Sequence, residues 1–274
     1  MSSRENAFTP SFLYGTAWKE ERTAELTLAA IEAGFRAIDT ANQRRHYDEA
    51  GVGEALAEAY RRGWVRREEL FLQTKFTYRG GQDHRLPYDP AATPSEQVAQ
   101  SMASSLEHLG TDYVDSFVLH GPASGYGWSE SDAEVWEAMR REQEAGRARV
   151  IGVSNVSHQH LQAMDDTPAF VQNRCYARLG WDREIRAFCH ERGIVYQGFS
   201  LLTANLEVLR HPLVQTIAGH LHATVAQVVF AFARQVGMLP LTGTTDVAHM
   251  REDLESLSLQ LPDEAVKTME GLVG

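Results

Sequence analysis

The strongest constraint on the fold is a strand-then-helix pattern that recurs eight times along the chain. Each short apolar run is followed by a polar or glycine-containing turn and then by a stretch with helical periodicity. The apolar runs lie at residues 12–18, 35–41, 69–76, 113–120, 148–155, 170–175, 194–200 and 238–244. Val, Ile, Leu and Phe occupy both faces of these runs, which is typical of strands covered by helices. Because no linker or shift in composition divides the chain, residues 1–274 are predicted to form a single-domain α/β fold, a (β/α)8 TIM barrel.

Helices are predicted over residues 21–33, 50–62, 95–109, 133–144, 157–164, 183–191, 205–236 and 247–257, with a last helix after Pro262. Ser95, Ser157, Asp182 and Asp246 are the expected N-caps, because short polar side chains accept hydrogen bonds from the first free amides of a helix. An open doubly wound sheet is the alternative fold. It is disfavoured because residues 15–20 read GTAWKE, without the glycine fingerprint that such sheets usually carry after the first strand.

The composition excludes several classes of partner. The chain carries 26 Lys and Arg residues against 37 Asp and Glu residues, a net charge of −11, which disfavours nucleic acid as a partner. No apolar run approaches the ~18 residues of a membrane span. The first ten residues, MSSRENAFTP, show no hydrophobic signal region.

Cys175 and Cys189 form no CxxC pair and are expected to be reduced. We therefore expect a cytoplasmic protein without a membrane partner, and a monomer or weak homodimer.

The chain has only three lysines, Lys19, Lys75 and Lys267. Lys19 and Lys267 lie in polar, helical surroundings, and we expect them to be replaceable. Lys75 lies in the apolar run LFLQTKF, although lysine is almost never fully buried without a partner. In a barrel, Asp39, Lys75 and His120 end three successive strands, and the C-terminal ends of the strands carry the active site. The three side chains are therefore expected to meet.

An Asp–Lys pair beside a tyrosine points to one kind of chemistry. A lysine ammonium stabilises phenolate and lowers the pKa of a phenol from about 10 toward neutrality, while the carboxylate keeps the lysine charged. A tyrosine tuned in this way donates a proton to a carbonyl oxygen as that oxygen becomes an alkoxide, and the histidine hydrogen-bonds the same oxygen. With a tyrosine beside them, Asp39, Lys75 and His120 therefore predict reduction of a carbonyl by hydride transfer, which requires a nicotinamide cofactor.

Several motifs, taken together, resemble those of the aldo-keto reductase superfamily. They are AGFRAIDTA (33–41), VGEAL (52–56), REELFLQTKF (67–76), DYVDSFVLHGP (112–122), GRARVIGVSN (146–155) and VQN (171–173). The resemblance implies a (β/α)8 barrel that binds NAD(P)H and reduces an aldehyde or ketone to an alcohol. It carries the catalytic tetrad over to Asp39, Tyr47, Lys75 and His120. It also implies that Ser154, Asn155 and Gln172 hold the carboxamide of the nicotinamide.

The position of the tyrosine departs from the family's pattern. Family members commonly have the tyrosine about five residues after the aspartate, whereas Tyr47 comes eight residues after Asp39 in DTANQRRHYDE. Counting back from the VG of VGEAL puts His46 nearer the usual slot. We favour Tyr47 as the acid, because a lengthened loop can return it to the mouth of the barrel, and His46 is the alternative.

The resemblance also implies the remaining cofactor contacts. Phe199 stands where many members have a tyrosine that stacks on the nicotinamide, and an aromatic ring suffices for stacking. Where many members have Lys and Ser for the 2′-phosphate of NADPH, this chain has Gly243 and Thr244. Asp246 repels a 2′-phosphate if it points inward. We expect NADPH as the cofactor, with NADH possible. The full expected cofactor set is Ser154, Asn155, Gln172, Phe199, Ser200, Leu202, Gly243, Thr244, Thr245 and Arg251.

The substrate pocket is expected to have aromatic walls. The candidate wall residues are Trp18, Phe76, Tyr78, Tyr126 and Trp128. The loop at residues 77–94 exceeds the ~12–15 residues of an ordinary connection, which indicates a functional wall or lid. An open, apolar-walled site favours aromatic or hydrophobic carbonyl substrates.

Two other functions are compatible with the sequence. The fold hosts many roles, so the displaced tyrosine leaves open a non-catalytic nicotinamide-nucleotide-binding barrel with a sensing or partner-binding role. A metal-dependent hydrolase would use Asp39, His120 and the pair His158 and His160. We interpret the histidine pair as solvated surface at a helix start, and we expect no metal.

Overall fold

Eight parallel strands close into a barrel in chain order, β1 to β8, in the computed structural model, which describes residues 10–272. The strands are β1 (Leu13–Gly15), β2 (Ala37–Asp39), β3 (Phe71–Phe76), β4 (Val114–Leu119), β5 (Ala148–Ser154), β6 (Phe170–Arg174), β7 (Val195–Phe199) and β8 (Met238–Thr242). The barrel closes where Leu13 of β1 pairs with Leu241 of β8. The predicted (β/α)8 barrel is confirmed, with each strand inside its predicted apolar run.

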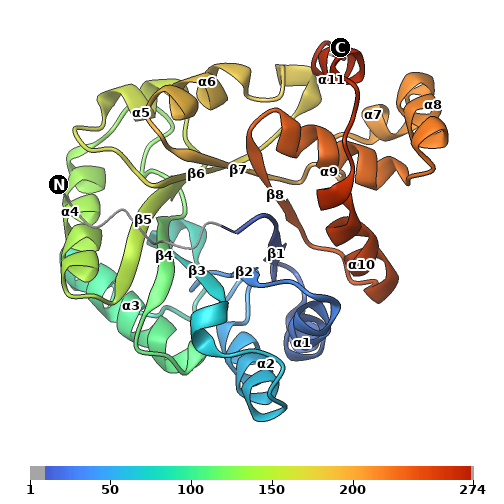
Figure 1. The fold of residues 1–274 in the computed structure, drawn as a ribbon. Helices are drawn as coiled ribbons and strands as arrows, with labels where there is room; N and C mark the ends of the chain where they lie inside the picture. Colours follow the sequence, from blue (N-terminus) through green and yellow to red (C-terminus); the bar gives the residue numbers. More distant parts are fainter. Residues whose placement is uncertain (1–9, 273–274) are drawn as a thin grey trace.

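Helices surround the strands (Figure 1). They are α1 (Thr23–Ala33), α2 (Glu49–Arg61), α3 (Pro94–Leu109), α4 (Glu130–Glu144), α5 (His158–Ala163), α6 (Arg183–Glu191), α7 (Leu206–Arg210), α8 (Pro212–Leu221), α9 (Val225–Gln235), α10 (Val247–Glu255) and α11 (Asp263–Glu270). The helical stretches predicted within 205–236 are three helices. They break before Pro212, where the ring leaves no amide to continue a helix, and at His222, whose φ is 51°. No single helix within residues 10–272 is long and apolar enough to cross a membrane; only α8 and α9 taken together, bent by 93°, reach the required length and composition.

The N-terminus of α3 differs from the predicted cap at Ser95. Thr93 is the N-cap: its Oγ1 accepts from the backbone N–H of Glu96 at 3.3 Å, and the Glu96 carboxylate accepts from the N–H of Thr93 at 2.8 Å. Pro94 follows as the first helical residue, where a missing N–H costs nothing. The reciprocal capping box and the proline therefore begin the helix one residue before Ser95.

Asp182 is a second cap prediction that the structure corrects. Its φ is 51° and its side chain makes no cap hydrogen bond. The carboxylate instead accepts from the hydroxyl of Tyr196 at 2.7 Å, which ties α6 to β7. The predicted caps at Ser157 and Asp246 are confirmed.

The inside of the barrel changes character along its axis. An apolar cluster fills the end where the strands begin, formed by Leu13, Ala37, Phe71, Phe170 and Leu239. Further along the same strands, buried polar side chains replace it, among them Asp39, Gln73 and Gln172. This division leaves the C-terminal ends of the strands as the polar end of the barrel.

Candidate active site

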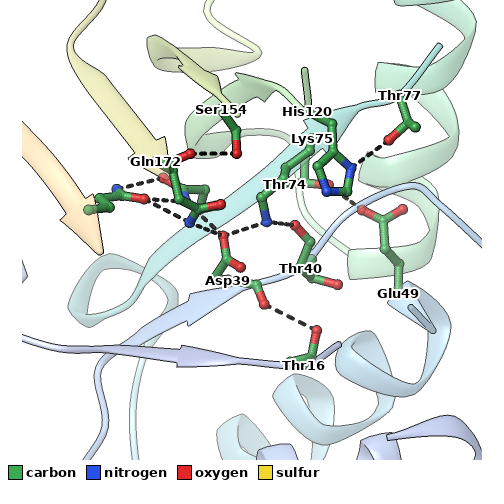
Figure 2. A network of polar contacts seen from close by, with 12 residues as sticks. Thr16, Asp39, Thr40, Glu49, Thr74, Lys75, Thr77, His120, Ser154 and Gln172 are labelled. Atoms are coloured by element: carbon green, nitrogen blue, oxygen red, sulfur yellow. Dashed lines mark hydrogen bonds and ion pairs between the residues drawn. The ribbon is translucent and has the colours of Figure 1, made fainter. Parts of the chain in front are cut away.

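A buried ion pair joins β2 and β3 at the C-terminal end of the barrel. Lys75 Nζ lies 2.6 Å from Asp39 Oδ1 and donates to the carbonyl of Thr40 at 2.8 Å (Figure 2). The two side chains are 1% and 4% exposed, respectively. Burial lowers the pKa of Lys75, and the negative charge of Asp39 opposes that shift. Because either charge alone would be buried without compensation, the two side chains depend on each other.

The loop between β2 and α2 holds Tyr47 over this ion pair. Lys75 Nζ lies 5.3 Å from the centroid of the Tyr47 ring, and the ring of His120 lies 5.8 Å from it. His46 also lies at the cavity, but it makes other contacts: its ring lies 3.9 Å from that of Trp18, and its Nδ1 lies 2.8 Å from Oε1 of Gln43. The lengthened loop thus brings Tyr47, and not His46, above Lys75.

The pKa of Tyr47 differs from the expectation based on its lysine neighbour. Burial raises the pKa of the phenol, and the negative charge of Asp39 raises it further. The phenol is therefore protonated throughout the neutral range.

His120 directly follows β4 and is a neutral imidazole. Burial, then the charge of Lys75, then His46 lower its pKa to about 3. Its Nδ1 lies 2.7 Å from the hydroxyl of Thr77, at the end of β3. This contact fixes the ring and leaves Nε2 as the nitrogen free for another partner.

A cavity of about 1190 Å³ opens above these groups. Its lining includes Asp39, Tyr47, His120, Ser154, Asn155, Gln172, Phe199, Ser200, Leu202, Gly243, Thr244 and Thr245. Lys75 lies behind this surface, paired with Asp39. The residues predicted from six different strand ends therefore share one continuous cavity. Arg251 is not among the described residues that line it; its side chain is exposed on α10.

The polar residues after β5 and β6 are linked to the ion pair by hydrogen bonds. Asn155 Nδ2 donates to the carbonyl of His120 at 2.7 Å, and Ser154 Oγ donates to the carbonyl of Gln172 at 2.7 Å. Gln172 Nε2 donates to Asp39 Oδ1 at 3.1 Å. The wall of the cavity and its floor thus form one connected polar structure.

Two of the five expected wall residues, Trp18 and Tyr78, line the cavity. Trp18 follows β1 and is 67% exposed at the rim. The loop predicted to form a wall also does so, because Tyr78 and the short helix Arg79–Gly81 both contribute to the lining.

The other three expected wall residues lie elsewhere. Phe76 is fully buried and packs against Tyr88 at 5.7 Å, because the alternation of β3 directs it outward, away from the face that carries Lys75. Tyr126 is 88% exposed, and Trp128 packs edge-on against Trp136 at 6.3 Å. The loop after β4 therefore does not refill the space beside Gly121.

The start of α10 is already occupied by a carboxylate. Asp246 Oδ1 accepts from the backbone N–H of Ala248 at 2.7 Å and of His249 at 3.2 Å. These are the amides that an anion at a helix N-terminus would otherwise use. The site expected to hold a 2′-phosphate thus carries its own negative charge.

Lys19 corrects the expectation that it is replaceable. It is 6% exposed, lines the cavity, and donates from Nζ to the carbonyl of Gly243, which follows the neighbouring strand β8. Burial, and secondarily Arg22, lowers its pKa to about 8. Its place directly after the first strand was the available signal, since strand ends carry the site. Lys267 is exposed on α11, as expected.

His158 and His160 do not join Asp39 and His120. His158 Nδ1 lies 2.7 Å from a carboxylate oxygen of Glu184, and His160 Nδ1 accepts from Ser157 at the start of α5. Neither is among the described residues that line the cavity. The arrangement proposed for a metal-dependent hydrolase is therefore not formed.

Comparisons with known proteins agree with this geometry. A sequence model of the Aldo/keto reductase family matches residues 11–273, so the chain belongs to this family and is an oxidoreductase. An aldo-keto reductase of Mycolicibacterium vanbaalenii is 33% identical over 89% of this chain and 81% of its own length. The prostaglandin-E(2) 9-reductase of Oryctolagus cuniculus is 28% identical over 97% of this chain and 88% of its own. The crystal structure of a Bombyx mori aldo-keto reductase with NADP has a TM-score of 0.80 and 24% identity, and the match covers 96% of this chain and 89% of that one.

Proposed function

We propose that this protein reduces an aldehyde or ketone to an alcohol with a nicotinamide cofactor. The observation that carries the proposal is the phenol of Tyr47, whose ring lies 5.3 Å from a fully buried Lys75 ammonium at the floor of a large cavity. A proton donor beside a fixed positive charge is suited to a carbonyl oxygen that gains negative charge.

Tyr47 is the proposed general acid. Because burial and Asp39 keep its phenol protonated, it enters the reaction with the proton that the carbonyl oxygen needs. Lys75, held by Asp39, stabilises the phenolate that remains. We propose that the Thr77 hydroxyl donates to Nδ1 of His120, so that Nε2 carries the proton and directs the carbonyl oxygen toward Tyr47.

The cavity offers polar and aromatic side chains that suit a dinucleotide cofactor. Ser154, Asn155 and Gln172 are proposed to hold the carboxamide, and Phe199 to stack on the ring. When bound, NADPH supplies the hydride. Lys19 is the buried cation for the phosphates, and Thr244, Thr245 and Arg251 serve the 2′-phosphate end. The related Bombyx mori fold was solved with NADP, which supports NADPH as the cofactor, with NADH as the weaker alternative.

The rim favours a hydrophobic carbonyl substrate. Trp18 and Tyr78 give it aromatic surface, and Gly121 leaves space beside His120. We also propose a cytoplasmic monomer or weak homodimer, in keeping with the acidic composition.

The test is the loss of absorbance at 340 nm with NADPH and NADH, in parallel, over aromatic and aliphatic aldehydes and ketones. We expect turnover with hydrophobic aldehydes and faster rates with NADPH. Quenching of tryptophan fluorescence by the cofactor without turnover across the panel would instead support the nucleotide-sensing barrel.

A further inference from the structure

Three buried glutamines cross the inside of the barrel beneath the cavity. Gln73 of β3, Gln172 of β6 and Gln197 of β7 are 0%, 3% and 0% exposed. Gln73 is the strand neighbour of Asp39, and Gln172 is the strand neighbour of Gln197. Two polar pairs on opposite sides of the barrel therefore meet at its axis, where most barrels pack branched apolar side chains.

Gln73 and Gln197 form a reciprocal amide pair. Gln73 Nε2 donates to Gln197 Oε1 at 2.8 Å, and Gln197 Nε2 donates back to Gln73 Oε1 at 2.9 Å. The second N–H of Gln73 donates to Asp39 Oδ1 at 2.7 Å. Since an amide nitrogen has only two N–H groups, those of Gln73 are fully used.

The same count of N–H groups determines the orientation of the Gln172 side-chain amide. Its Nε2 donates to Asp39 Oδ1 at 3.1 Å and to Gln197 Oε1 at 2.9 Å, which uses both N–H groups (Figure 2). Gln172 lines the cavity, and within residues 10–272 no donor is bonded to its Oε1. The group left for a ligand is therefore a carbonyl oxygen.

Asp39 determines which groups donate and which accept in this hydrogen-bond network, because an ionised carboxylate accepts hydrogen bonds and cannot donate them. Its Oδ1 receives Lys75 Nζ, Gln73 Nε2 and Gln172 Nε2. A flipped Gln172 amide would place its oxygen against Asp39 Oδ1 and Gln197 Oε1, exchanging two hydrogen bonds for two oxygen–oxygen contacts. The ion pair thus dictates, through Gln73 and Gln197, which end of Gln172 faces the cavity.

We propose that Gln73 and Gln197 are positioning residues. They hold the Gln172 amide in one orientation, with its oxygen toward the cavity, where it accepts a hydrogen bond from the N–H₂ of the cofactor's carboxamide. This rests on the proposed function, and it adds a specificity: the site selects a nicotinamide ring that carries a primary amide. A ring with a ketone in that position presents an acceptor to an acceptor.

The test compares two ligands on one protein. The first is NADP⁺; the second is its 3-acetylpyridine analogue, in which a methyl ketone replaces the carboxamide. Dissociation constants are measured by calorimetry, without turnover. We expect the wild type to bind the analogue about tenfold more weakly or worse, since Gln172 Oε1 is then buried without a donor.

Gln197→Leu removes one of the two acceptors that hold the Gln172 amide, and the ratio of the two constants is expected to fall at least about threefold. The ratio cancels any general loss of affinity or stability. Gln235→Leu is the matched control: it loses the hydrogen bonds of Gln235 with Leu261, outside the barrel, and the ratio should stay at the wild-type value. If Gln197→Leu does not fold, Gln73→Leu removes the partner of Gln197 and tests the same prediction.

Each outcome decides the proposal. Wild-type discrimination that falls in Gln197→Leu or Gln73→Leu supports it. Equal wild-type affinity for the two ligands, or discrimination that survives both substitutions, overturns the positioning role while leaving the reductase function intact. If the wild type binds neither ligand, the proposed function fails and the inference fails with it.

Discussion

The two ends of the large cavity are built on opposite principles. Around Asp39 and Lys75, charged side chains are buried, paired and tied to their neighbours by short hydrogen bonds. Around Gly243 and Asp246, the chain is exposed and the helix N-terminus is capped by its own carboxylate. Lys19 is the exception there, as a buried cation whose ammonium donates to a backbone carbonyl.

This difference indicates where the chain tolerates change. Water screens exposed charges, so single substitutions near α10 should have small effects. Water does not screen a buried ion pair, so substitutions near β2 and β3 should have large effects. Four variants, from the largest expected effect to the smallest, test this contrast.

Tyr47→Phe is expected to lower kcat by about 10²- to 10⁴-fold, because it removes the proposed general acid and keeps the ring. Cofactor affinity should stay near the wild-type value. Steady-state rates and calorimetry measure the two effects. Tyr113→Phe, a half-buried tyrosine at the opposite end of β4, is the control. Wild-type turnover in Tyr47→Phe would remove this residue from the mechanism and return attention to His46.

Lys75→Met is expected to destabilise the fold by about 3 to 5 kcal/mol, because it leaves the Asp39 carboxylate buried without its counter-charge. Urea unfolding measures this. The double variant Asp39→Asn/Lys75→Met should recover much of the loss, since no unpaired charge remains. If the double variant is as unstable as Lys75→Met alone, an unpaired Asp39 charge does not explain the loss of stability.

Lys19→Met is expected to weaken NADPH binding by roughly tenfold at pH 7, which corresponds to about 1.4 kcal/mol. The pKa of about 8 adds a pH signature. Below it the ammonium attracts phosphate, and above it the neutral amine does not, so wild-type affinity should fall as pH rises through about 8. Lys19→Met should be flat over the same range, and exposed Lys267→Met should follow the wild type. A wild-type profile without this fall would place the phosphates elsewhere.

Asp246→Ser is expected to have the smallest effect. It keeps a cap on α10 but removes a negative charge, so affinity for NADPH relative to NADH should rise about two- to fivefold. The readout is the ratio of the two kcat/KM values. Asp263→Ser at the start of α11 changes the same charge in another place and should leave the ratio alone. An unchanged ratio in Asp246→Ser would mean that this carboxylate does not face the 2′-phosphate.

Gln73 and Gln197, unlike Gln172, could not be selected from the sequence. Gln73 and Gln197 lie inside strands that read as apolar, and a single polar residue there looks like an ordinary strand position. Their importance depends on Asp39 standing beside Gln73 on one side of the barrel and Gln172 beside Gln197 on the other. Such contacts join residues 124 positions apart, which no local pattern can reveal.

The sequence by itself determined the barrel and the expectation that Asp39, Lys75 and His120 would meet, because strand periodicity fixes which residues end each strand. Only the tertiary structure decided the rest. It brought Tyr47 over Lys75, buried Lys19, turned Phe76 away from the cavity and raised the pKa of the phenol that a nearby lysine was expected to lower. The physical reason is that loop paths, burial and the pairing of charges depend on neighbours that are distant in the chain.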